Sequence, residues 1–138
     1  MVYRGAFSGD LLLREKIGRP FFEVASDISF TRVSGAVITV PAGTRTDLFS
    51  VPKPLRSIVS AMQKSSIPAV LHDYAYREQI FGADGRAEAD KLIVEAMHAV
   101  NYEAYIRGEK KVFSNYKIAK IYSGLKLGGW ITYRRYKK

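Results

Sequence analysis

The segment RAEADKLIVEAMHAV, residues 86–100, carries the clearest helical pattern in the chain. Its apolar residues recur at intervals of three and four, the spacing of one face of an α-helix. They are Ala89, Leu92, Ile93, Ala96, Met97 and Val100. We expect this face to be buried. Asp90 falls at the edge of the face, where we expect it to reach a cleft without entering the core, and His98 points away from the face toward solvent.

Two further helices are predicted on either side of this one. Residues 67–79, IPAVLHDYAYREQ, place Pro68 in a first helical turn, where proline is tolerated. The glycines of FGADG, residues 81–85, end that helix. Residues 113–124, FSNYKIAKIYSG, predict a third helix that Gly124 closes, with its Lys residues in water and its Tyr and Ile residues toward the core. WITY, residues 130–133, is predicted to be a short strand.

The first part of the chain is rich in residues that favour strands. Residues 20–40, PFFEVASDISFTRVSGAVITV, predict two or three antiparallel strands with a turn at VSG, residues 33–35. VYRGAF, residues 2–7, is a possible further strand, and VPAGTRTDLFSVPKPL, residues 40–55, is a proline-broken loop. Strands followed by helices predict an α+β fold, with a small antiparallel sheet packed against about three helices in a single domain, residues 1–138.

The composition of the chain excludes several kinds of functional site and of protein. The chain has 138 residues, 47% of them hydrophobic, and no cysteine, which excludes disulfides, thiolate metal sites and cysteine nucleophiles. No apolar run reaches the roughly 20 residues of a membrane span, and the N-terminus makes a poor signal peptide. The net charge of +9 lies in a basic C-terminal segment, residues 107–138, where ten Lys and Arg face Glu109 alone. Such a segment attracts polyanions: nucleic acid, acidic lipid headgroups or an acidic protein surface.

Four residues form a candidate site if the fold brings them together. The four candidate metal ligands are Asp47, His72, Asp73 and Asp90. This combination of imidazole and carboxylates suits zinc, manganese or iron. A divalent metal there would lower the pKa of bound water and create a hydroxide. Without a metal, His72 is the candidate general base, with a carboxylate such as Asp73 fixing its tautomer. Tyr76 lies one turn beyond His72 on the same face and could donate a hydrogen bond to substrate.

The same residues also have structural explanations. Asp73 can form an ion pair with Arg77 or Arg45, and Asp47 can close a turn in its loop. Asp90 in a first helical turn is favoured by the helix dipole alone. From composition and spacing, both explanations stay open.

Four segments carry a family resemblance. VPAGTRTDLFSVP (40–52), AVLHDYAYRE (69–78), ADKLIVEAMHAVN (89–101) and YSGLKLGGW (122–130) occur in that order. Together they resemble the phage- and prophage-encoded family called domain of unknown function 1353. The matching positions are Val40, Pro41, Gly43, Thr46, Asp47, Ser50, Val51, Pro52, His72, Asp73, Tyr76, Ala89, Asp90, Met97, Gly128 and Gly129. The resemblance implies a phage or prophage origin, a place in the host cytoplasm or the virion, and the clustering of the four candidate ligands. The basic tail TYRRYKK, residues 132–138, lies outside the matching segments.

Two functions follow as expectations. The first is a small hydrolase, metal-assisted or His-based, acting on the cell wall, a nucleotide signal or a peptide bond. The second is a non-enzymatic virion component or assembly accessory that docks on a phage or host protein, or on DNA, through the basic segment. Nucleic acid would be held through a flexible tail carrying Arg134, Arg135, Lys137 and Lys138. A phage-encoded inhibitor of a host defence is a third possibility, which the sequence does not separate from the second.

Overall fold

The computed structural model describes residues 5–15, 17–19, 21–46 and 67–135. Within these ranges, short strands come first and three helices follow. The strands are β1 (Ala6–Ser8), β2 (Leu13–Glu15), β3 (Phe22–Val24), β4 (Ile28–Thr31), β5 (Val37–Val40) and β6 (Arg45–Thr46). The helices are α2 (Ile67–Glu78), α3 (Arg86–Ile106) and α4 (Asn115–Arg135). The predicted α+β class is confirmed. No helix in the described ranges is both long enough and apolar enough to cross a bilayer.

The strands form two antiparallel sheets of three strands each, in the orders β1-β4-β5 and β2-β3-β6. The hairpin of β4 and β5 closes at residues 33–35 as predicted, with the Arg32 N–H donating to the Ala36 carbonyl at 2.7 Å. Gly35 takes a φ of +92° in this turn, a conformation that suits glycine. The inward-facing residues of the hairpin are buried: Ile28, Phe30, Ile38 and Val40.

Two strands were not predicted. Arg45–Thr46, inside the predicted loop 40–55, pair with β3 as β6, and residues 13–15 pair with the other edge of β3 as β2. These strands are two and three residues long, and pairing with β3 holds them where their own sequence is not strand-like. Of the possible strand at residues 2–7, residues 6 and 7 belong to β1 and residues 2–4 lie outside the described residues.

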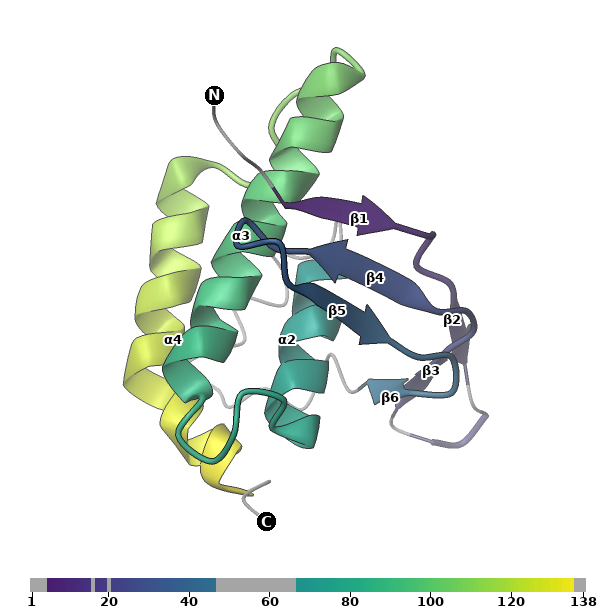
Figure 1. Ribbon diagram of the computed structural model, residues 1–138, viewed down its shortest axis with the longest axis vertical. Coiled ribbons are helices and arrows are strands. Elements are labelled where there is room, and N and C mark those ends of the chain that lie inside the picture. The colour runs from purple at the N-terminus through teal and green to yellow at the C-terminus, as the bar shows by residue number, and fades with distance from the viewer. Residues whose placement is uncertain (1–4, 16, 20, 47–66, 136–138) are drawn as a thin grey trace.

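The three helices lie together on one side of the sheets (Figure 1), with α3 between α2 and α4. One core cluster joins the strands to α2 and to one face of α3. Its strand members include Phe30 and Val40, α2 adds Val70 and Leu71, and α3 adds Leu92. A second cluster joins the other face of α3 to the segment 113–125. It contains Ile93, Met97, Val100, Phe113, Ile118, Ile121 and Leu125.

The apolar face predicted for residues 86–100 is confirmed, since all six of its members are buried. The helix is longer than predicted and ends at Ile106. His98 is exposed, as expected. Because α3 has one cluster on each side, it is the central element on which both halves of the core depend.

The predictions for the C-terminal region were partly wrong. α4 begins at Asn115 but continues past Gly124 to Arg135, so residues 130–133 are helical and not a strand. Leu125, in the turn that follows Gly124, is buried against α3, and its burial outweighs the roughly 1 kcal/mol that an interior glycine costs. Tyr116 faces solvent with 74% of its surface exposed, contrary to the expectation for the helix's tyrosines. Arg134 and Arg135 belong to the last turn of α4 and not to a flexible tail, while Lys137 and Lys138 lie outside the described residues.

Candidate functional site

Three of the predicted site residues meet between α2 and the first turns of α3. His72 Nε2 lies 2.9 Å from Asp90 Oδ1, and the Tyr76 hydroxyl donates to the same oxygen at 2.5 Å. Asp90 is only 1% exposed, so the expectation that it sits at the edge of a cleft is wrong. The side chain is buried because α2 packs over the first turns of α3 and supplies the polar partners that a buried carboxylate needs.

The local structure explains this convergence. His72 and Tyr76 are four residues apart, so they share one face of α2, and their ring centroids lie 4.0 Å apart. The turn between the helices, residues 79–85, contains Gln79 and Gly82 at positive φ and reverses the chain. Gly85, the N-cap residue of α3, lies against Phe81, and an added Cβ there would lie 2.4 Å from the Phe81 Cβ. The absence of a side chain at Gly85 thus permits the close approach that brings Asp90 under α2.

Arg86 is a member of the site that the sequence analysis did not select. Its Nη1 lies 3.4 Å from Asp90 Oδ2 and donates to the Leu125 carbonyl of α4 at 3.0 Å. Both oxygens of Asp90 are therefore engaged, and the site spans all three helices. An available signal was the separation of four residues between Arg86 and Asp90, which places an Arg and an Asp on one helical face.

The hydrogen bond to Asp90 fixes the orientation of the His72 ring. A carboxylate oxygen only accepts, so the His72 Nε2 that faces Asp90 carries the proton. In the neutral imidazole Nδ1 then holds the lone pair, and the described residues provide no hydrogen-bond partner for Nδ1. The His72 side chain keeps 12% of its surface exposed, whereas Asp90 keeps 1%. The arrangement is that of an imidazole held by a buried carboxylate through one of its nitrogens.

Tyr76 serves this arrangement from within the core. Burial raises the pKa of the Tyr76 hydroxyl well above its usual range, and the negative charge of Asp90 raises that pKa further. The hydroxyl therefore stays protonated and donates a hydrogen bond to Asp90. Tyr76 was expected to donate to substrate, but in the structure it fixes the carboxylate.

The structure places Asp73, whereas Asp47 lies outside the described residues. The Arg77 Nε lies 3.0 Å from Asp73 Oδ1, an ion pair between residues four apart on α2 that one of the structural explanations anticipated. Asp73 is turned by about 100° around α2 from its neighbour His72. Among the described residues, no group of three His, Cys, Asp or Glu side chains is arranged to hold a metal ion.

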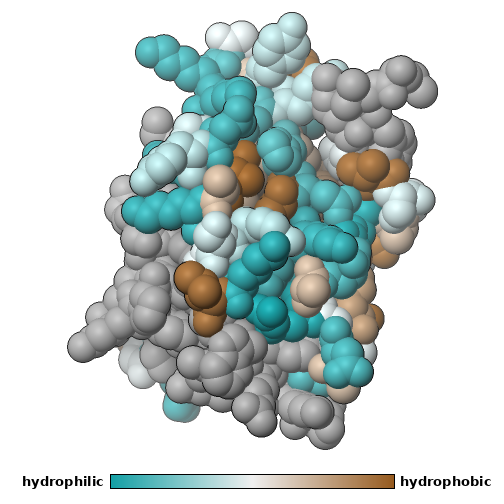
Figure 2. All heavy atoms as spheres, turned by 90° about the vertical axis from the view of Figure 1, so that its left-hand side faces the viewer, coloured by the Kyte–Doolittle hydropathy of each residue, from teal (hydrophilic) through white to brown (hydrophobic). Residues whose placement is uncertain are grey.

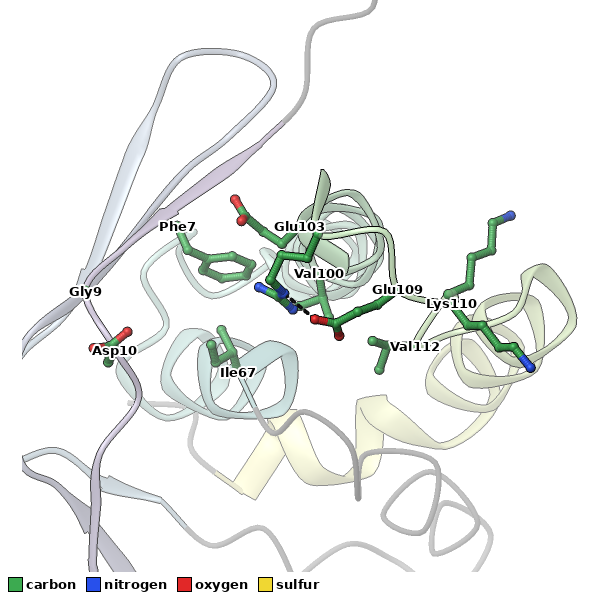
Figure 3. Close-up of a pocket in the computed structure, with 11 residues that line it drawn as sticks. Phe7, Gly9, Asp10, Ile67, Val100, Glu103, Glu109, Lys110 and Val112 are labelled. Carbon is green, nitrogen blue, oxygen red and sulfur yellow. Dashed lines mark hydrogen bonds and ion pairs between the residues drawn. The ribbon is translucent and has the colours of Figure 1, made fainter. Parts of the chain in front are cut away.

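A hollow of about 690 Å³ lies elsewhere, at the C-terminal end of α3 (Figure 3). Its apolar lining comes from Phe7 of β1, Ile67 of α2, Val100 of α3 and Val112. Charged residues complete the lining: Asp10, Glu103, Arg107, Glu109, Lys110 and Lys111. Arg107 and Glu109 neutralise each other through an ion pair of 2.7 Å, drawn as a dashed line in Figure 3. The described members of the predicted site, His72, Asp73, Tyr76 and Asp90, do not line this hollow, so it is separate from the His72 site.

Comparison with known proteins gives a family but no activity. A family model described as "Protein of unknown function (DUF1353)" matches residues 22–108, a range that contains His72, Tyr76, Arg86 and Asp90. Over 58 residues the chain is 40% identical to the uncharacterized protein y4jT of Sinorhizobium fredii. The aligned segment covers 41% of this chain. The match spans 17% of that relative's length, well under two thirds of it. No solved structure matches the chain.

Proposed function

This chain belongs to the DUF1353 family of proteins of unknown function, and from that premise we propose that it is a small hydrolase built around His72 and Asp90. The observation that carries the proposal is the hydrogen bond of 2.9 Å between His72 Nε2 and the buried Asp90. A histidine held in one tautomer by a buried carboxylate is a common arrangement for general-base catalysis.

The proposed chemistry uses His72 as the base. Nδ1 removes a proton from a water molecule, and the oxygen of that water attacks the carbonyl carbon or the phosphorus of the substrate. The imidazolium that forms keeps its Nε2 proton directed at Asp90, whose negative charge stabilises it. Nδ1 then returns the added proton to the leaving group. The substrate classes are those expected for a phage product: cell-wall polymer, nucleotide or peptide.

Tyr76 and Arg86 act as positioning residues in this scheme. Each donates to Asp90, so the carboxylate cannot rotate away from His72 without losing a hydrogen bond. Arg86 also donates to the Leu125 carbonyl, which ties the orientation of Asp90 to α4. Asp73 flanks His72 in sequence and keeps its candidate catalytic role as a proposal.

A metal-assisted form of the same reaction is part of the proposal. His72 Nδ1 is the atom that would bind Zn²⁺ or Mn²⁺, and Asp90 would then orient the ligand through the other nitrogen, as carboxylates do for many metal-bound histidines. The described residues do not complete a ligand set, so further ligands such as Asp47 would have to come from outside them. Elemental analysis of the untagged protein, purified without chelators, tests this form directly.

The experiment compares the two histidines of the chain. The wild type is assayed at pH 7 against chromogenic carboxylate and phosphate esters, with and without added Zn²⁺ or Mn²⁺. We expect His72→Gln to lower kcat/KM by about 100-fold or more. His98→Gln removes the other, exposed histidine and is expected to leave activity unchanged. Circular dichroism confirms that each variant is folded. Equal activity in the wild type and in folded His72→Gln contradicts the proposal, as does a wild type inactive on the whole panel.

A second candidate is a non-enzymatic virion or assembly component that docks through the basic segment. The exposed lysines of the described part of this segment, such as Lys117 and Lys120, favour it. Mass spectrometry of purified particles tests this role, if the gene is phage-borne: detection in stoichiometric amounts supports it, and absence from particles contradicts it.

A further inference from the structure

Five exposed lysines lie on α4 or in the five residues that precede it, and none of them has an acidic partner among the described residues. They are Lys110, Lys111, Lys117, Lys120 and Lys126. The nearby Arg107 and Glu109 form an ion pair and cancel each other. From residue 107 to residue 127 the sequence holds six Lys or Arg residues and one Glu, a net charge of +5. This excess lies outside the His72 site and is not used by the proposed hydrolysis.

The other two helices differ in this respect. Arg77 of α2 pairs with Asp73, and on α3 Arg86 pairs with Asp90 and Lys91 with Glu88. All cations of α2 and α3 thus have a carboxylate partner, whereas the described lysines of α4 have none. The positive charge of α4 is available for a partner outside the chain.

The exposed side of α4 combines this charge with aromatic and apolar surface. Tyr116, Lys120 and Leu127 are four and seven residues apart, so they form one stripe, and Tyr116 and Leu127 are 74% and 81% exposed. Lys117 and Lys126 lie on the two flanks of this stripe, and Lys126 Nζ is 4.5 Å from the ring centroid of Tyr122. Figure 2 views the side of the molecule on which α4 lies and shows hydrophilic residues across its centre with isolated hydrophobic ones. We call this surface, residues 110–127, the lysine face.

We propose that the lysine face binds single-stranded nucleic acid. Lysines neutralise phosphates without reading sequence, and an exposed tyrosine among them provides a ring on which an unpaired base can stack. In a duplex the base faces are covered by their neighbours, so Tyr116 would have no such partner. An acidic protein fits less well, because protein interfaces are depleted in lysine and enriched in arginine, and the five exposed cations here are all lysine.

The test measures binding of the full chain to a fluorescein-labelled 20-nucleotide oligo(dT) by fluorescence anisotropy between 50 and 300 mM NaCl. We expect log Kd to rise linearly with log salt concentration. Lys120→Glu is compared with Lys91→Glu, which makes the same change in charge on an exposed residue of α3. Lys120→Glu is expected to weaken binding by about tenfold and to flatten the salt slope, because the reversed charge loses a phosphate contact. Lys91→Glu is expected to weaken it less than twofold.

The aromatic contribution has its own pair of variants. Tyr116→Ala is expected to weaken oligo(dT) binding by at least about fivefold. Tyr105→Ala removes a tyrosine that is equally exposed, at 76%, from α3 and is expected to have no effect. His72→Gln is also expected to have no effect, so failure of the hydrolase proposal and failure of this one are distinguishable.

Several outcomes overturn the proposal. They are no binding at 50 mM NaCl, equal losses for Lys120→Glu and Lys91→Glu, and unchanged affinity of Tyr116→Ala. Binding to a 20-base-pair duplex at least as tight as to oligo(dT) also overturns it, because that result identifies a general polyanion surface. Binding to poly-glutamate without binding to oligo(dT) assigns the face to an acidic protein instead.

Discussion

The side chain of Asn101, on α3, forms hydrogen bonds with both the N–H and the carbonyl of Phe113. The Asn101 Nδ2 donates to the Phe113 carbonyl at 2.7 Å, and the Asn101 Oδ1 accepts from the Phe113 N–H at 2.8 Å. Asn101 is 7% exposed and the Phe113 side chain is fully buried. The pair anchors the loop that leads into α4, and it supplies hydrogen bonds to backbone groups that have left water.

Replacement of Asn101 by alanine leaves both Phe113 backbone groups buried without this partner. We expect Asn101→Ala to lower the free energy of unfolding by about 2–4 kcal/mol, measured by urea titration. Asn115→Ala, at an exposed asparagine at the start of α4, is the control and is expected to cost less than about 0.5 kcal/mol. Equal losses in the two variants would contradict the assigned role of Asn101.

Arg32 links the β4–β5 turn to α3 through two carboxylates of different exposure. The Arg32 guanidinium forms ion pairs with Glu95 and, at 2.8 Å, with Glu88. Glu95 also accepts a hydrogen bond from the Val33 N–H at 3.1 Å. The Arg32 side chain is 9% exposed, so loss of the better buried partner leaves a nearly buried charge. We expect Glu95→Gln to lower the free energy of unfolding by about 2–3 kcal/mol, and Glu88→Gln, at a more exposed glutamate, by less than about 1 kcal/mol. Urea titration of both variants checks the order, and a larger loss in Glu88→Gln refutes it.

Because the pKa of Tyr76 is raised, we expect the stability of the fold to decrease at alkaline pH. Because the folded pKa lies above the unfolded value of about 10, the stabilisation is fully present below pH 10 and is lost as pH rises beyond it. Wild type is therefore expected to lose more stability between pH 9 and pH 11 than Tyr76→Phe, which lacks the titrating hydroxyl. Tyr116→Phe, altered at an exposed tyrosine, is expected to follow wild type. Parallel pH profiles for wild type and Tyr76→Phe would show that burial and the charge of Asp90 do not raise the pKa of Tyr76.

Gly85 and Gly82 are predicted to tolerate alanine differently. At Gly85 an added Cβ would lie 2.6 Å from the backbone carbonyl carbon of Phe81, so the chain would have to move. At Gly82 no atom lies within 4 Å, and only the φ of +85° is unfavourable. We expect Gly82→Ala to cost about 1 kcal/mol and Gly85→Ala about 2–3 kcal/mol in thermal or urea unfolding. The reverse order would place the constraint in the turn conformation and not in the contact with Phe81.

The parts of the fold that depend on one segment alone were predictable. Leu92, Ile93 and Ala96 have a spacing that only a helix with a buried face explains, and the structure confirms it. The pattern predicts a helix that ends at Gly124, whereas α4 continues to Arg135. Whether a helix continues through glycine depends on what its next turn packs against, here α3, and one segment does not contain that information.

The site was only partly predictable for a similar reason. The separation of four residues predicted that His72 and Tyr76 share a face, which the structure confirms. The burial of Asp90 depends on α2 packing over the start of α3, a tertiary contact that no local pattern encodes. Arg86 was missed because an arginine in a first helical turn is usually solvated. Its second partner, the Leu125 carbonyl, lies 39 residues away in sequence.

The position of α4 has a consequence for how the protein should be produced in pieces. The family match ends at residue 108, yet Ile93, Met97 and Val100 find their cover in residues 113–125. A fragment that ends at residue 108 would expose these three hydrophobic side chains to water. It would also lose the hydrogen bond from Arg86 to the Leu125 carbonyl. A fragment made for crystallisation, or for insertion into a larger protein, therefore needs to extend to residue 135.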